Sequence, residues 1–80
     1  MDMRHLEEEV QRLVGYDCLV TSGVAGQGPY LNFNANRRLL RIWVPRQDAD
    51  PKRIAEMARS YLSSKDEPAY KEMSYEAKQE

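Results

Sequence analysis

Arginine and aromatic side chains are the residues of this chain whose types and spacing could carry chemistry. The group lies within residues 30–46 and comprises Tyr30, Arg37, Arg38, Leu39, Arg41, Trp43 and Arg46. Guanidinium forks bind carboxylates and phosphates, and aromatic residues and arginine are enriched where proteins bind their partners. The group therefore predicts a partner-binding surface, with either a protein or a nucleic acid as the partner.

The residue types that enzymes use are sparse. His5 is the only histidine, and helical spacing places it away from the apolar stripe, without a partner or pocket to tune it. Cys18 is the only cysteine and has the inward parity of a strand, where a thiol acts as an apolar side chain. Glu7, Glu8 and Glu9 are consecutive and point in three directions around a helix. We therefore expect no catalytic, metal-binding or cofactor-binding residues, and no enzyme activity.

The glycines of residues 23–28 have a spacing reminiscent of a phosphate-binding loop. Such a loop requires a Lys-Ser/Thr pair and a following helix, whereas Pro29 and a strand pattern follow here. We expect residues 22–29 to form a flexible loop between two strands.

Charge is unevenly distributed along the chain, although the net charge is only -1. Residues 37–53 are predominantly basic, while the segments on both sides carry more acidic than basic residues. Because acidic segments repel phosphate, this distribution favours a protein partner over a nucleic acid.

Length and composition predict one small globular domain. The chain has 80 residues, of which 41% are hydrophobic and 31% charged, as in ordinary folded proteins. Its apolar runs are far shorter than the roughly 20 residues that span a bilayer, and no signal-peptide pattern follows Met1. We expect a cytoplasmic protein that does not interact with membranes.

Two amphipathic helices are predicted. Residues 3–14 repeat apolar side chains at three- and four-residue spacing, between a capping Asp2 and a terminating Gly15. Asp50-Pro51 starts the second helix, because aspartate caps the free amides and proline suits the first helical position. Its apolar stripe consists of Ile54, Met57, Ala58, Tyr61 and Leu62.

Between the helices, alternation of apolar and polar residues predicts three strands at residues 16–21, 30–34 and 38–44, with a tight turn at 34–36. Short connections favour an antiparallel meander, so the predicted class is α+β with both long helices on one sheet face. The expected core side comprises Cys18, Val20, Leu31, Phe33, Leu40, Ile42 and Val44. The expected open side comprises Leu19, Tyr30, Asn32, Leu39, Arg41 and Trp43.

Residues 1–65 are thus expected to form a single αβββα domain. The remaining segment, residues 66–80, has a Pro68 start and apolar spacing at Tyr70, Met73 and Ala77. It is expected to be a short helix or a partly disordered tail, because isolated helices of this length are marginal in water.

Three short motifs match a known arrangement of elements over residues 3–62. They are Gly15-Tyr16 after the first helix, Ser22-Gly23 after the first strand and Val44-Pro45 before the second helix. In this order of elements the chain resembles the double-stranded-RNA-binding fold and the related HicA-type toxins. Those toxins cut RNA with a histidine that follows a Gly-Ser pair, and this chain has no histidine there, so the resemblance implies the fold and an RNA partner but not the cleavage.

Together these observations predict a small non-catalytic binding domain that engages a larger macromolecule. The favoured partner is a protein or protein complex, with an accessory or inhibitor role such as those encoded by mobile elements. The alternative is an RNA- or DNA-binding module that uses the basic residues 37–53, and a homodimer through the open face is a further alternative.

Overall fold

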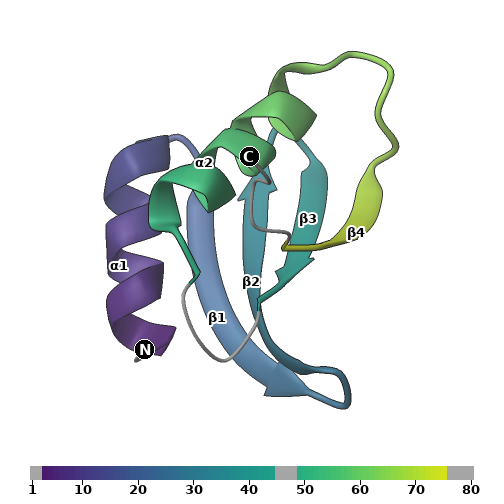
Figure 1. Cartoon of the computed structure of the whole chain (residues 1–80). Helices are drawn as coiled ribbons and strands as arrows, with labels where there is room; N and C mark the ends of the chain where they lie inside the picture. The colour runs from purple at the N-terminus through teal and green to yellow at the C-terminus, as the bar shows by residue number, and fades with distance from the viewer. Residues whose placement is uncertain (1–2, 45–48, 76–80) are drawn as a thin grey trace, which may run out of the picture.

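The chain folds into two helices packed on one face of a four-stranded sheet (Figure 1). The computed structural model describes residues 3–44 and 49–75. In chain order the elements are α1 (Met3–Val14), β1 (Leu19–Ala25), β2 (Gly28–Ala35), β3 (Arg38–Trp43), α2 (Pro51–Ser63) and β4 (Tyr70–Ser74). Strands β1 to β3 form an antiparallel meander, and β4 is parallel to β3. The predicted α+β class, with both long helices on the same face, is confirmed.

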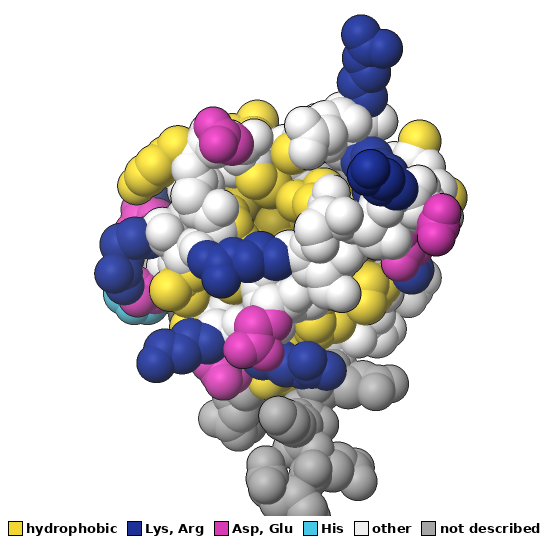
Figure 2. Space-filling model, turned by 90° about the horizontal axis from the view of Figure 1, so that it is seen from above, with side chains coloured by type: hydrophobic (Ala, Val, Ile, Leu, Met, Phe, Trp, Pro, Cys, Tyr) yellow, Lys and Arg dark blue, Asp and Glu magenta, His cyan; other side chains and the backbone are white. Residues whose placement is uncertain are grey.

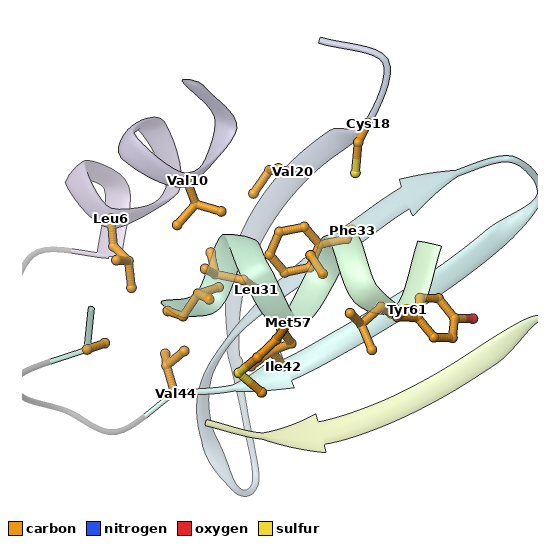
Figure 3. Close-up of a cluster of buried hydrophobic side chains, with 14 residues drawn as sticks. Leu6, Val10, Cys18, Val20, Leu31, Phe33, Ile42, Val44, Met57 and Tyr61 are labelled. Atoms are coloured by element: carbon orange, nitrogen blue, oxygen red, sulfur yellow. The ribbon is translucent and has the colours of Figure 1, made fainter. Parts of the chain in front are cut away.

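The core lies between the helices and the sheet, as Figure 3 shows. Every strand residue predicted on the core side is buried, and Leu31, Phe33, Leu40 and Ile42 have no exposed surface. The cluster is completed by Leu6 and Val10 of α1, by Ile54, Met57, Ala58 and Tyr61 of α2, and by Ala49. Burying a large apolar side chain stabilises a fold by roughly 1.5–3 kcal/mol, so this cluster is the main favourable contribution to folding.

A glutamine of α1 covers part of the outer edge of β1. The Gln11 side chain donates to the carbonyls of Gly15 and Cys18, at 2.8 and 2.7 Å, and accepts from the Val20 amide at 3.0 Å. The Cys18 carbonyl and the Val20 amide point away from β2. On the free edge of a sheet such backbone groups would otherwise be exposed. This contact also fixes the position of α1 beside the sheet.

Both ends of α2 are held by side chains. Asp50 caps its start by accepting from the Lys52 amide at 3.0 Å, with Pro51 in the first turn, as the sequence predicted. At the other end, Arg38 of β3 donates to the Tyr61 carbonyl at 3.2 Å and to the Ser64 carbonyl. The Tyr61 carbonyl also accepts from the amide of the C-cap residue Ser64 at 3.3 Å, and Arg38 adds a cation at this end of the helix, where carbonyls lack the usual helical partners.

The predicted loop over residues 22–29 is wrong, because β1 and β2 continue through most of it to a two-residue turn at Gly26 and Gln27. Gly23 does not end the strand: it lies within β1, opposite Tyr30 of β2. Pro29 is tolerated because it lies opposite Val44, just past the last residue of β3, where a missing amide removes little from the ladder.

A short helix was one prediction for the segment after Pro68, but residues 70–74 form strand β4 instead. Met73 lies opposite Ile42 on the core side, and the Tyr75 amide donates to the Trp43 carbonyl at 2.7 Å. Helix α2 provides the long crossover that parallel pairing requires. Pairing with β3 gives this segment hydrogen-bond partners and a place for Met73 against the core, and it brings residues of the 66–80 segment into the sheet. Ala77 lies outside the described residues.

The turn between β2 and β3 is centred on Asn36 and Arg37, slightly later than predicted. Both have positive φ angles, 53° and 62°, as in the type I′ turn that joins two strands with a two-residue loop. Asparagine tolerates this conformation, but a long side chain such as arginine is strained in it by about 1–2 kcal/mol.

Replacing Arg37 with glycine should relieve that strain. We expect Arg37→Gly to raise the free energy of unfolding by about 0.5–1 kcal/mol, the strain relief less the entropy that glycine loses on folding. Chemical denaturation monitored by circular dichroism would measure it. The matched control is Arg37→Ala, which also removes the charge but keeps the strain and should bring no gain. Equal stabilisation by both variants would show that charge, not backbone conformation, is responsible.

Candidate interaction surface

The sheet face opposite the helices presents its side chains in three rows across the four strands. The rows are Leu19–Asn34–Leu39–Tyr70, Thr21–Asn32–Arg41–Glu72 and Gly23–Tyr30–Trp43–Ser74. We call this set the open face. Both described helices lie on the other side of the sheet (Figure 1). Leu19 and Tyr70, at the two ends of one row, are 60% and 47% exposed.

Arg41 is the centre of an aromatic cluster on the open face. Its guanidinium carbon lies 3.9 Å from the centre of the Tyr30 ring and 5.5 Å from that of Trp43. Its Nε donates to Asn32 Oδ1 at 2.9 Å. The two rings meet edge to face, 5.3 Å apart. Stacking and hydrogen bonding together therefore hold the guanidinium in one orientation.

Glu72 of β4 adds a carboxylate to the cluster. Its Oε1 accepts from Trp43 Nε1 at 3.0 Å, and its Oε2 accepts from the Tyr70 hydroxyl at 2.7 Å. The hydrogen bond from Tyr70 is the largest cause that lowers the pKa of the Glu72 carboxyl, and the bond from Trp43 is the next. The hydrogen bond between Tyr70 and Glu72 also raises the pKa of the Tyr70 hydroxyl. Glu72 is therefore ionised and Tyr70 protonated at neutral pH.

A glycine makes room for this cluster. A Cβ atom on Gly23 would lie 2.5 Å from the Tyr30 hydroxyl oxygen and 2.7 Å from Cζ. The Tyr30 ring therefore occupies the space where any other residue would place its side chain. Aromatic cover of a strand glycine is a common way to stabilise a sheet at such a position.

The structure brings together four of the residues that the sequence singled out, namely Tyr30, Leu39, Arg41 and Trp43. Arg37 lies exposed in the β2–β3 turn, and Arg38 points to the helix side, where it holds α2. Arg46 lies outside the described residues. Arg37, Arg38 and Arg41 thus lie on different parts of the molecule rather than in one patch.

Sequence reasoning missed Glu72 and Tyr70, because it placed them in a helix. The available signal was the alternation of Tyr70 and Glu72 with Lys71 and Met73, which is as consistent with a strand as with a helix.

The molecule also has a hollow of about 940 Å³ at one end, visible in Figure 2 as apolar side chains surrounded by polar and charged groups. Its lining consists of Val14, Asp17, Cys18, Ala35, Asn36, Arg59, Ser60, Leu62 and Ser63. Burial raises the pKa of the Cys18 thiol, which keeps it protonated and a poor nucleophile. Arg59 already donates to the Leu13 carbonyl.

The remaining candidates for chemistry are dispersed. His5 is exposed on α1, and Glu9 forms an ion pair with Arg12. Within residues 3–44 and 49–75, no three histidine, cysteine, aspartate or glutamate side chains lie close enough to hold a metal ion. The cluster on the open face is therefore the most organised group of polar and aromatic side chains.

Substituting Gly23 should disturb this cluster directly. We expect Gly23→Ala to displace the Tyr30 ring, to lower the free energy of unfolding by about 1 kcal/mol or more, and to change the fluorescence of Trp43. The matched control is Gly26→Ala, since nothing lies within 4 Å of the added carbon there. If both variants behave alike, the Tyr30 ring does not depend on the space above Gly23.

Protonation of the Glu72 carboxylate should change the fluorescence of Trp43, which donates to it and is the only tryptophan in the sequence. Because the folded pKa lies below its ordinary value of 4.5, the stabilisation by this carboxylate is complete above that pH and is lost as the pH falls through the lowered value. We expect a fluorescence change with a midpoint below 4.5. Glu72→Gln should lack this step, and an unchanged titration in that variant would contradict the assignment.

No helix in the described parts of the chain is long and apolar enough to cross a membrane. Comparison of the chain with protein-family models, with curated proteins and with solved structures found no match.

Proposed function

We propose that this protein is a small non-catalytic binding domain that engages a larger protein through the open face of its sheet. The observation that carries the proposal is the cluster of Tyr30, Arg41 and Trp43, which is held in place internally yet lies on the face without helices. Aromatic residues and arginine are the side chains that most often dominate the binding energy of protein interfaces.

The composition of the open face favours a protein over a nucleic acid. Among its described positions Arg41 is the single cation, and Glu72 balances it with a negative charge. Nucleic-acid binding draws its affinity from several phosphate contacts that release counterions, which this face cannot supply. The Tyr30 ring is already in contact with Arg41, so it is poorly placed to stack on a base.

Apolar side chains next to the cluster support the same choice. Leu19 and Tyr70 are exposed large hydrophobic residues, and Leu39 lies between them in the same row. Protein interfaces typically combine such apolar contacts with a few polar groups that set orientation. An accessory or inhibitor role in the cytoplasm fits a domain of this size with one buried, reduced cysteine.

Affinity capture from a lysate of the cells that encode the chain, followed by mass spectrometry, tests the proposal. The test variant is Leu39→Ala/Trp43→Ala, and the control is Arg37→Ala, which lies off the open face. We expect a captured protein to be retained by the control and lost by the double variant, with a cost of about 2 kcal/mol or more in measured affinity, as for an interface hot spot. Circular dichroism establishes that each variant is folded.

Salt dependence and a third variant separate the alternatives. For a protein partner, salt should mainly change the association rate. Steeply salt-dependent binding to RNA or DNA that survives Trp43→Ala and is lost in Lys52→Ala/Arg53→Ala would overturn the proposal in favour of a nucleic-acid module. Sedimentation of the purified chain tests the homodimer, and self-association that the double variant abolishes would replace the larger partner by a second copy.

A further inference from the structure

The guanidinium of Arg41 is fixed in a way that leaves its outer edge available. Its Nε is engaged by Asn32, and the Tyr30 ring lies 3.9 Å from the guanidinium carbon. Among the described residues, no hydrogen bond or ion pair reaches the two terminal nitrogens, Nη1 and Nη2. An arginine that is stacked on a ring and bonded through Nε presents its two terminal nitrogens as a pre-formed fork.

The protein keeps its own nearby carboxylate away from that fork. Glu72 lies directly opposite Arg41 in the β3–β4 register, yet its two oxygens accept from Trp43 and Tyr70 instead. No ion pair forms between Arg41 and Glu72, although the charge of Arg41 contributes to the lowered pKa of the Glu72 carboxyl. Different hydrogen bonds thus orient the cation and the anion of the open face, and none of them occupies the two terminal nitrogens of Arg41.

A carboxylate is the ligand that fits this fork best. Two parallel N–H···O bonds match a planar carboxylate to a planar guanidinium, and they strengthen when a docking partner excludes water. A phosphodiester chain would bring several negative charges toward Glu72 with only Arg41 to offset them. The apolar side chains of Leu39 and Tyr70, which adjoin Arg41 and Glu72 along the strands, suit apolar residues next to the acid.

We infer that Arg41 is a receptor for an acidic side chain, so the partner docks an aspartate or glutamate, flanked by apolar residues, at the centre of the open face. This inference rests on the proposed function, since it specifies the chemistry of the partner at the same surface. It assigns Arg41 the recognition of the acid, and it assigns Glu72 the separate task of ordering Trp43 and Tyr70.

A displayed library of random peptides provides the probe. The library is selected on the folded full chain after depletion on Leu39→Ala/Trp43→Ala, so that only open-face binders remain. Each recovered peptide is synthesised with its acidic residue and with the matching amide, Asp→Asn or Glu→Gln. Affinities of both forms are measured against the wild type, Arg41→Lys and Arg41→Gln, with Arg37→Lys as the control.

We expect the open-face peptides to share an acidic residue whose amide form binds the wild type about tenfold more weakly, as for a close charge pair. Arg41→Lys should weaken the acidic peptide about tenfold as well, because lysine keeps the charge but lacks the fork. The acid and amide forms should bind Arg41→Gln almost equally, and Arg37→Lys should behave as the wild type. The acid-to-amide comparison on the wild type needs no altered protein, so it stands even if an Arg41 variant fails to fold.

The other outcomes separate this inference from the proposed function. Open-face peptides that lack an acid, or whose acid is indifferent to Arg41, would overturn the inference and leave the protein-binding function standing. If the depletion removes every peptide that binds the wild type, all binders are indifferent to Leu39 and Trp43, and both the inference and the proposed function are overturned. Arg41-dependent binding of mixed-sequence oligonucleotides, measured in parallel, would replace the carboxylate by phosphate and also overturn the inference.

Discussion

The alternation of side chains along β3 is the constraint on which the rest of the structure depends. Leu40 and Ile42 are fully buried under the helices, while Leu39, Arg41 and Trp43 project from the opposite face. Because the period of a strand is two, burying one set necessarily exposes the other. A shift of one residue in the pairing would bury a guanidinium and an indole in the core, so the core and the candidate surface determine each other.

Strand β3 is also paired on both sides, and its two neighbours make different contributions to the surface. Strand β2 brings Tyr30 and Asn32 to Arg41, which orients the guanidinium. Strand β4 brings Glu72 to Trp43, which orients the indole. The meander alone would leave Trp43 without this acceptor, so the parallel strand completes the cluster.

Order in the unbound state has a direct consequence for binding. A free arginine side chain loses about 2 kcal/mol of rotamer entropy when it is fixed at an interface. Here the stacking on Tyr30 and the bond to Asn32 fix Arg41 before any partner arrives. A surface whose polar groups are already oriented loses less entropy on association, and more of its contact energy remains as affinity.

The sequence by itself determined the fold class, the strand residues of the core and the start of α2, because apolar periodicity and the Asp50-Pro51 cap are local signals. It also placed Tyr30, Leu39, Arg41 and Trp43 on one face, since strand parity alone assigns them there. Only the tertiary structure decided that residues 70–74 form a strand, because their conformation comes from hydrogen bonds to β3, far away in sequence. For the same reason, the attachment of Arg38 to α2 and of Glu72 to Trp43 could not be read from composition or spacing: each joins residues more than twenty positions apart.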